Sequence, residues 1–300
     1  MKSLAKKGAQ RRWSVALFVL ALGALAGTMP AAAQPAPIPT AQAGGYGDDA
    51  AHGAYVNVNG IQLYYEDHGV GPVLLQLHGN GGDIASMAAQ IAGLSPAFRV
   101  IAVDSRGHGK SEMGSARLTY EQMAEDVNAL LDQLKLKSVH VLGWSDGGIV
   151  GLLLALYHPD KVAKLAIMGA NLNPGGVHGW ALDWVAAQIK TVETKLASGD
   201  TSRAWQHQRQ RLDLMDRQPN IAAAELRRIS APTLVMAGDR DIVRAEHTFS
   251  IFENLPRAQL ALFPGATHFI PVAEPVLFNM TVRNFFLRPF TRPDSRNALR

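Results

Sequence analysis

The chain of 300 residues contains no cysteine, so disulfide bonds and thiolate chemistry are excluded. This absence is compatible with an oxidising compartment but does not establish one. A long apolar run is missing as well. The best candidate, residues 13–27, spans 15 residues, whereas a membrane-crossing helix needs about twenty. The sequence contains no internal repeat, which argues against a repeat architecture.

An excess of charge of one sign is also missing from most of the chain. The 29 Lys and Arg residues exceed the 25 Asp and Glu residues by four, but five of the basic residues lie before Ala33, where there is no acidic residue. The remainder holds 24 basic and 25 acidic residues. Because no basic stripe remains, we predict no binding to nucleic acid or to an anionic membrane.

The N-terminus has the pattern of a targeting segment. Five basic residues precede the apolar stretch 13–27, and Ala31-Ala32-Ala33 supplies an A-x-A cleavage site. This pattern predicts a signal peptide over residues 1–33, cleaved near Ala33, and hence a secreted or periplasmic protein without stable membrane association. An uncleaved anchor is the alternative, which the short apolar core disfavours. Residues 34–53 are rich in Ala, Pro and Gly and predict a flexible leader.

Residues 143–147 read GWSDG and lie between the apolar runs 138–142 and 149–157. This context predicts a strand, a sharp turn and a helix, with Ser145 exposed on the turn as a nucleophile. Glycine is required two positions before and after the serine, because side chains there would collide with the neighbouring strand and helix. The alternative is a glycine-rich turn that carries a solvated serine.

Three more strand-like runs end in loops that suit the same chemistry. The first ends in the loop 78–82 (HGNGG), where glycines allow backbone N–H groups to turn toward an oxyanion. The second, residues 233–237, is followed by Asp239 and Asp241, and the third by His268. The order Ser, Asp, His differs from the orders in the chymotrypsin and subtilisin folds and is the order of the α/β-hydrolase fold.

Strand-like and helix-like segments alternate along the chain. Asn59-Gly60 lies between two runs of period-two alternation, which predicts a β-hairpin. Residues 99–103 predict a buried strand, and Thr119 with Gln122 predicts a capping box at the start of the next helix. This alternation predicts the α/β class, with a mostly parallel sheet covered by helices on both faces.

These motifs resemble the α/β-hydrolase superfamily over roughly residues 55 to 288. The resemblance rests on His78-Gly79, residues 104–111 (DSRGHGKS), the GWSDG turn and the loops around Asp241 and His268. It implies an α/β-hydrolase core over residues 54–170 and 230–290. It also implies a small helical cap over residues 171–229.

Within the superfamily, residues 143–149 (GWSDGGI), Lys164 and residues 167–171 (IMGAN) resemble the valacyclovirase (biphenyl hydrolase-like) branch. That resemblance implies hydrolysis of α-amino acid esters, with the acid after the nucleophile receiving the substrate ammonium. The sequence departs from this branch at His78, which the valacyclovirase loop lacks, and in the details of residues 238–243.

The residues predict a Ser-His-Asp triad. Ser145 is the predicted nucleophile, His268 the base that removes its proton, and Asp241 the acid that orients the base. Asp239 competes with Asp241 for the last role, and its alternative function is to shape the loop. His78 and His108 lie beside glycines in turns, where structural hydrogen bonds are the expected role.

Further residues are predicted to bind the substrate. The backbone N–H groups of Asn80 and Asp146 would hold the oxyanion. The Asp146 side chain either pairs with a substrate ammonium or provides a favourable charge at a helix start. We predict that Trp144, Trp180 and Trp184 contact the substrate, the last two from an apolar roof over the site; for Trp180 and Trp184, packing within the core of the cap is the alternative.

The sequence therefore predicts a serine hydrolase of carboxylic esters that works through an acyl-enzyme without metal or cofactor. Its candidate substrates are small esters with an apolar part, among them α-amino acid esters, or activated amides. Lactone, C–C bond or perhydrolytic chemistry on the same triad is one alternative. A non-catalytic ligand-binding module is another, which the intact triad disfavours. The sequence defines no oligomeric state.

Overall fold

The computed structural model describes residues 45–200 and 202–298. The predicted signal peptide (1–33) and the first part of the predicted leader (34–44) lie outside the described residues. In the described part of the chain, no helix is long and apolar enough to cross a membrane.

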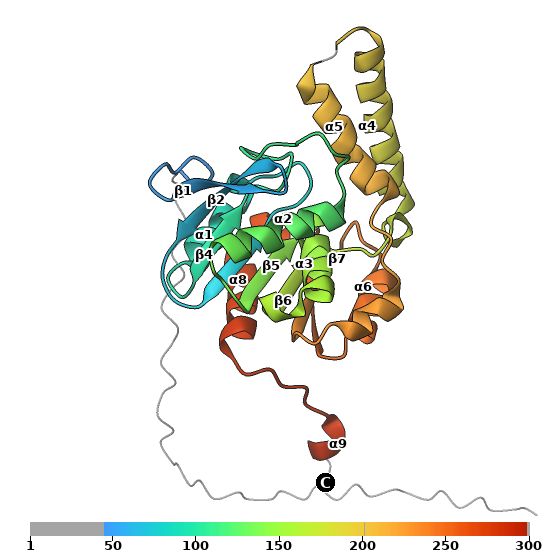
Figure 1. Cartoon of the computed structure of the whole chain (residues 1–300). Helices are drawn as coiled ribbons and strands as arrows, with labels where there is room; N and C mark the ends of the chain where they lie inside the picture. The colour runs from blue at the N-terminus through green and yellow to red at the C-terminus, as the bar shows by residue number, and fades with distance from the viewer. Residues whose placement is uncertain (1–44, 201, 299–300) are drawn as a thin grey trace, which may run out of the picture. The chain divides into compact units, whose positions relative to one another are not determined.

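Eight strands form one mixed sheet at the centre of the fold (Figure 1), in the order β1-β2-β4-β3-β5-β6-β7-β8. Only β2 runs against its neighbours, β1 and β4; the other adjacent strands are parallel. The strands are β1 (Gly53–Val58), β2 (Ile61–His68), β3 (Val73–Leu77), β4 (Arg99–Val103), β5 (Val139–Trp144), β6 (Val162–Met168), β7 (Thr233–Arg240) and β8 (Ala258–Thr267).

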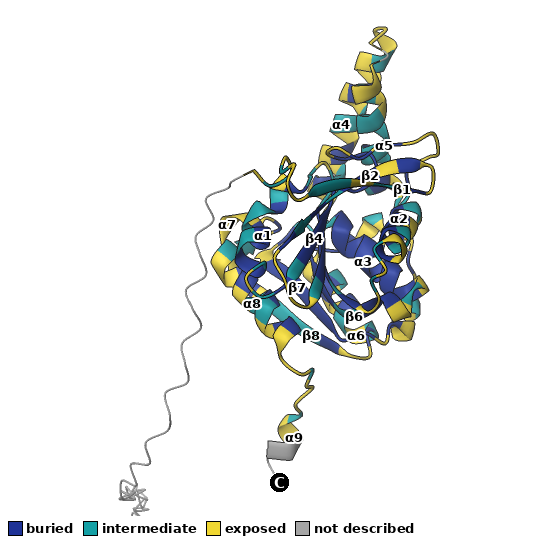
Figure 2. Cartoon of the chain, turned by 60° about the vertical axis from the view of Figure 1, so that its left-hand side comes forward, coloured by how far each residue is buried: buried dark blue, intermediate teal, exposed yellow. Residues whose placement is uncertain are grey.

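Helices cover both faces of the sheet, as the alternating sequence pattern predicted. One apolar core joins the sheet to α2, α3 and α6, and a second joins its other face to α1, α7 and α8. Figure 2 shows the buried strands between these two layers. The helices are α1 (Ala88–Leu94), α2 (Tyr120–Gln133), α3 (Asp146–Tyr157), α4 (Gly179–Ala197), α5 (Arg203–Arg217), α6 (Ala245–Asn254), α7 (Ile270–Ala273), α8 (Pro275–Leu287) and α9 (Ser295–Ala298).

The predicted hairpin turn at Asn59-Gly60 forms, and the predicted capping box at Thr119 forms in part. Val58 pairs with Ile61 across the Asn59-Gly60 turn, where both central residues have positive φ. At the start of α2, the Thr119 hydroxyl accepts a hydrogen bond from the Gln122 N–H at 3.1 Å. Among the described residues, no hydrogen bond joins the Thr119 N–H to the Gln122 side chain, whose amide group donates to Asp126 at 3.2 Å.

The end of the predicted flexible leader differs from the prediction. The N–H groups of Gly47 and Asp49 each donate to the buried Glu66 carboxylate at 3.0 Å, and the Tyr46 ring packs edge-on against His68. Residues from 46 onward therefore belong to the folded unit. Composition alone missed this, because the anchoring carboxylate lies on β2.

Between β6 and β7 the chain forms α4 and α5, which pack against each other beyond the end of the sheet (Figure 1). Their buried contacts form a small third core of Val185, Val192 and Leu212, with Trp205 packed against it. This segment occupies the region in which the sequence predicts a helical cap.

Candidate active site

Ser145 lies on a strained turn between β5 and α3. Its φ of 55° and ψ of −117° lie in a region that L-residues rarely adopt. A Cβ on Gly143 would lie 2.2 Å from the Gly147 carbonyl oxygen, and one on Gly147 would lie 2.2 Å from the Leu77 carbonyl oxygen. Glycine is therefore required at both positions, because the backbone of α3 lies too close to Gly143 for a side chain and the backbone of β3 lies too close to Gly147. The turn has the local geometry of a nucleophile elbow.

The structure brings His268 and Asp241 together. His268 follows β8 and Asp241 follows β7, and both side chains are buried. His268 Nδ1 lies 2.7 Å from Asp241 Oδ1. The same carboxylate accepts hydrogen bonds from the N–H groups of Gly238 and Val243. A carboxylate held in this way orients the ring and favours the proton on Nδ1.

Asp239, the competing acid, lies elsewhere. Its carboxylate accepts a hydrogen bond from the Gly265 N–H at 3.0 Å and is exposed to solvent. It therefore joins the end of β7 to Gly265 near the end of β8, away from the imidazole.

Gly169 lies against the His268 imidazole and lines the same cavity as Ser145. A Cβ on Gly169 would lie 2.6 Å from His268 Cε1 and 3.5 Å from Asp241 Oδ2. Gly169 and Ser145 both line one cavity of about 290 Å³. The serine and the His268–Asp241 pair therefore adjoin a common pocket.

The glycine-rich loop after β3 also lies against the serine. A Cβ on Gly79 would be 3.1 Å from Ser145 Cβ, so the backbone before Asn80 passes directly beside the turn. Asp146 is the first residue of α3. The backbone N–H groups of Asn80 and Asp146, which are predicted to hold an oxyanion, therefore belong to the two segments beside the serine.

The Asp146 carboxylate is buried and has polar partners that the sequence did not reveal. It accepts a hydrogen bond from the Asn80 amide at 2.9 Å and another from the Tyr120 hydroxyl. Burial raises its pKa to about 6, although both hydrogen bonds and the nearby His268 favour the charged form. Tyr120 was visible in the sequence only as the residue after a helix cap, and no local pattern indicated its role.

Asn80 connects this carboxylate to α5. Its side-chain amide donates both to Asp146 and to the backbone carbonyl of Arg211, the latter at 3.0 Å. The Arg211 guanidinium in turn donates to the carbonyl of Gly107 in the loop after β4. The segment above the site is thus attached to two loops of the sheet.

The cavity wall is largely apolar, and two of the three predicted tryptophans line it. Trp180 and Trp184 of α4 do so while remaining 60% and 54% exposed, so they stand at its rim. Asp146, Asn171 and Gln218 are among its few polar residues. The lining residues are Tyr120, Ser145, Asp146, Gly169, Asn171, Val177, Trp180, Ala181, Leu182, Trp184, Val185, Met215, Gln218, Ile242, Val243 and Phe269.

Trp144 does not line this cavity, which corrects its predicted contact with substrate. Its indole is buried in the core shared with α7 and α8, and its N–H donates to the His268 carbonyl at 2.9 Å. Because Trp144 still belongs to β5, its side chain follows the pleat to the sheet face opposite α3. It supports the backbone of His268 instead.

His78 and His108 have the structural roles expected of them. His78 Nε2 accepts a hydrogen bond from the Ser105 N–H, and its Nδ1 lies 2.8 Å from the Gly79 carbonyl. Burial and then the neighbouring His78 lower the pKa of His108 to about 3. Neither ring lines the cavity beside Ser145.

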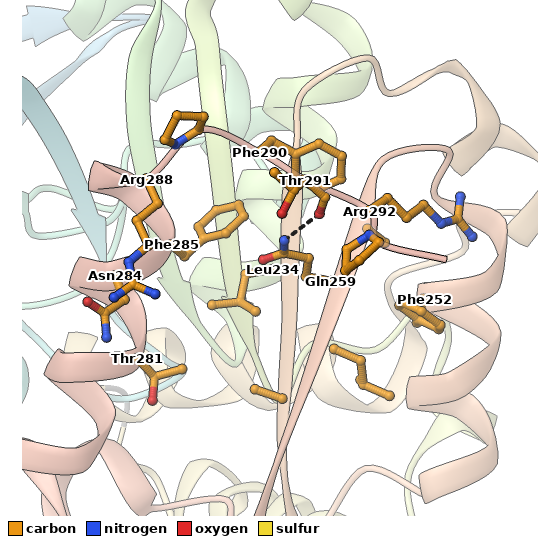
Figure 3. A pocket seen from close by; sticks show the side chains of 15 residues that line it. Leu234, Phe252, Gln259, Thr281, Asn284, Phe285, Arg288, Phe290, Thr291 and Arg292 are labelled. Atoms are coloured by element: carbon orange, nitrogen blue, oxygen red, sulfur yellow. Dashed lines mark hydrogen bonds between the residues drawn. The ribbon is translucent and has the colours of Figure 1, made fainter. Parts of the chain in front are cut away.

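A second hollow, of about 760 Å³, lies between β8, α8 and the C-terminal segment (Figure 3). Gln259 donates to the Thr291 carbonyl across it, and Phe285, Phe290 and Leu234 form an apolar wall. Among the described residues that line it there is no histidine and no carboxylate. This hollow is larger than the cavity at Ser145, but the described residues that line it supply no acid–base group.

The alpha/beta hydrolase fold family model matches residues 72–222. The chain belongs to the α/β-hydrolase family. The hydrolase is 30% identical over 263 residues to the "Putative carbamate hydrolase RutD" of Caulobacter sp. (strain K31), covering 74% of this chain and 95% of that protein. It is also 29% identical over 248 residues to the human serine hydrolase BPHL, covering 77% of this chain and 85% of BPHL. The second relationship supports the branch that the GWSDGGI run indicated.

A solved structure agrees with this assignment. The hydrolase superposes on a hydrolase from Pseudomonas aeruginosa PA01 with a TM-score of 0.67 and 26% identity, covering 80% of this chain and all of the other. The family model and the similarity to these hydrolases together place this protein among the enzymes of the hydrolase class.

Proposed function

We propose that this hydrolase cleaves carboxylic esters through an acyl-enzyme on Ser145. The observation that carries the proposal is the strained Ser145 turn, which opens into the cavity that adjoins the His268–Asp241 pair. A serine hydroxyl is a weak nucleophile until a base removes its proton, and a buried imidazole oriented by a carboxylate provides such a base.

In the proposed reaction, Ser145 Oγ adds to the ester carbonyl carbon while His268 takes the hydroxyl proton. The backbone N–H groups of Asn80 and Asp146 stabilise the negative oxygen that forms. The C–O bond to the alcohol then breaks, and the alcohol leaves with the proton from His268. Water repeats both steps on the acyl-serine and releases the acid. Neither half of the reaction requires a cofactor.

We further propose that Asp146 favours substrates with an ammonium group. An anionic side chain buried beside the nucleophile, within a mostly apolar wall, would pair with a cation and repel an anion. With a pKa of about 6, Asp146 is mainly ionised at pH 7 despite its burial. The mouth residues Trp180 and Trp184 suit an apolar acyl or alcohol group.

The test compares kcat/KM for an α-amino acid aryl ester with that for its isostere lacking the amine, with Ser145→Ala as the blank. A preference of about tenfold or more corresponds to about 1.4 kcal/mol of transition-state discrimination and supports amine recognition. The preference is expected to decrease as the pH falls through about 6, because Asp146 then becomes neutral. The ratio of the two esters cancels any titration that both substrates share.

Other outcomes lead to other assignments. Equal rates for the two esters would leave an esterase in which Asp146 serves the helix start. If neither ester is cleaved above the blank, the ester proposal fails, and a lactone and a carbamate become the next substrates to assay. Ligand affinity without turnover, unaffected by Ser145→Ala, would instead indicate a binding protein.

We also propose that residues 171–229 act as a cap that shields the acyl-enzyme from bulk water.

We propose further that the protein is exported. This proposal rests on the basic and apolar N-terminal pattern and its Ala31-Ala32-Ala33 site. Mass spectrometry of the protein recovered from its native host tests it. A mature chain that begins just after Ala33 supports export with cleavage, and an intact N-terminus contradicts it.

A further inference from the structure

A cluster of potential metal ligands lies at the edge of the sheet, away from Ser145. Asp49 and His52 belong to the turn that precedes β1, and His68 ends β2. One ligand atom of each residue lies within 4.8 Å of those of the other two, and in the described part of the chain no other group of three such residues meets this condition. β2 is separated from β5, which leads to Ser145, by β4 and β3.

Asp49 and His52 are held together by the turn. Asp49 Oδ2 lies 2.7 Å from His52 Nδ1, while its Oδ1 accepts the Ala51 N–H. The N–H groups of His52 and Gly53 both donate to the Asp49 carbonyl, at 3.1 and 2.7 Å. The carboxylate and the imidazole therefore face each other on a backbone that is already fixed.

His68 is oriented by Glu66, which lies two residues earlier on the same strand. His68 Nε2 lies 3.0 Å from Glu66 Oε2. Because an ionised carboxylate only accepts hydrogen bonds, the proton is on Nε2, and in the neutral ring Nδ1 is the nitrogen with a lone pair for a metal. A carboxylate that fixes the tautomer and ring orientation of a histidine in this way is a recurrent partner of metal-binding imidazoles.

The surroundings hold this arrangement in place. Glu66 is fully buried and also accepts hydrogen bonds from the Tyr64 hydroxyl and from the N–H groups of Gly47 and Asp49. The rings of His52 and His68 lie with their centroids 4.6 Å apart. One carboxylate thus positions both the strand ligand and the turn that carries the other two.

We propose that Asp49, His52 and His68 bind a zinc ion, with Glu66 as the positioning residue for His68. Two imidazole nitrogens and one carboxylate oxygen match the preferences of Zn²⁺, whereas Mg²⁺ and Ca²⁺ prefer sets made only of oxygen. Bonds of about 2.0–2.2 Å put the ligand atoms of a tetrahedral site about 3.3–3.6 Å apart, so small side-chain rotations would close the site. Water would complete the coordination.

Bound zinc would join the segment before β1 to β2 without contacting the substrate cavity. This inference is independent of the proposed esterase function. It predicts that zinc stabilises the native fold, because the ligands come together only there. It also predicts that a chelator leaves ester hydrolysis unchanged.

The test uses the untagged full chain, freed of metal with a chelator and titrated with Zn²⁺ against a chromophoric competitor. Residues 1–44 contain no His, Asp or Glu, so they add no competing side chains of these types. The variants are Asp49→Asn and His52→Gln. His158→Gln is the matched control, since His158 pairs with Glu125 at 2.8 Å on another part of the surface.

We expect one zinc ion per chain, an affinity at least about tenfold lower in Asp49→Asn and in His52→Gln, and no change in His158→Gln. At a zinc concentration above the Kd of the native chain but below that of the two ligand variants, zinc should raise the Tm of the native chain only, and Mg²⁺ at the same concentration should have no effect. Equal zinc affinity in all four proteins would overturn the proposal, as would the absence of stoichiometric binding. Activity with and without chelator is a separate readout, so a failed ester assay does not affect this result.

Discussion

Asp241 and Asp239 are two residues apart, yet only Asp241 contacts the His268 imidazole. We expect Asp241→Asn to lower kcat by about 10³-fold or more, because an amide can present a donor to Nδ1 and stabilise the wrong tautomer. Asp239→Asn should change kcat by less than about twofold, because its amide oxygen can still accept from Gly265. Steady-state kinetics of both variants provide the measurement, and the reverse pattern of sensitivity would transfer the acid role to Asp239.

Asp146 links the site to stability through its titration. Its folded pKa of about 6 is above the ordinary value, so its ionised form destabilises the native state above pH 6, and this penalty disappears as the pH falls. This difference of about 2 between the folded pKa and the ordinary pKa corresponds to at most about 3 kcal/mol. The free energy of unfolding of Asp146→Asn minus that of the native chain should therefore increase by up to about 3 kcal/mol between pH 4 and pH 8. Urea unfolding at both values measures this difference; a difference independent of pH contradicts the burial argument.

At the scale of the elements, the turn between β5 and α3 depends on two close backbone approaches. A Cβ on Gly143 or Gly147 would meet a backbone carbonyl oxygen at 2.2 Å, and backbone atoms cannot move aside as a side chain can. We expect Gly143→Ala and Gly147→Ala each to lower the free energy of unfolding by about 2 kcal/mol or more. Gly179→Ala is the control, because a Cβ at this first residue of α4 would meet nothing within 4 Å. Urea unfolding of the three variants tests this, and equal stability would refute the proposed backbone collision.

At the scale of the whole described unit, Leu214 of α5 joins the core that covers the sheet, whereas Val185, Val192 and Leu212 of α4 and α5 form a separate core. That core is small, whereas α3 is buried along nearly its whole length against the sheet. Local opening requires less free energy where few apolar contacts are lost. We therefore expect the amides of α4 and α5 to exchange with deuterium faster than those of α3 and β5 in hydrogen-exchange mass spectrometry. Equal protection in both regions would mean that the segment above the site opens only with the whole fold.

The sequence by itself determined the features that depend on neighbours along the chain. The strand period, the Asn59-Gly60 turn, the Thr119 cap and the close approach of Gly143 to Gly147 each act within a few residues, so the strands, the hairpin and the serine turn were predictable. The order of Ser145, Asp241 and His268 along the chain then indicated which strand ends had to meet. The composition of residues 34–53 was misleading for its second half, because the anchor, Glu66, is outside that segment.

Only the tertiary structure decided which side chains from distant segments meet. Asn80, Tyr120 and Asp146 come from a loop and two helices, and no local pattern indicates that they share hydrogen bonds. The pleat of β5 turned Trp144 into the core, and the approach of β7 and β8 brought Asp241, rather than Asp239, to His268. The physical reason is range: propensity and turn chemistry act between neighbours in sequence, whereas burial, pKa shifts and side-chain hydrogen bonds depend on how the packed layers bring separate segments together.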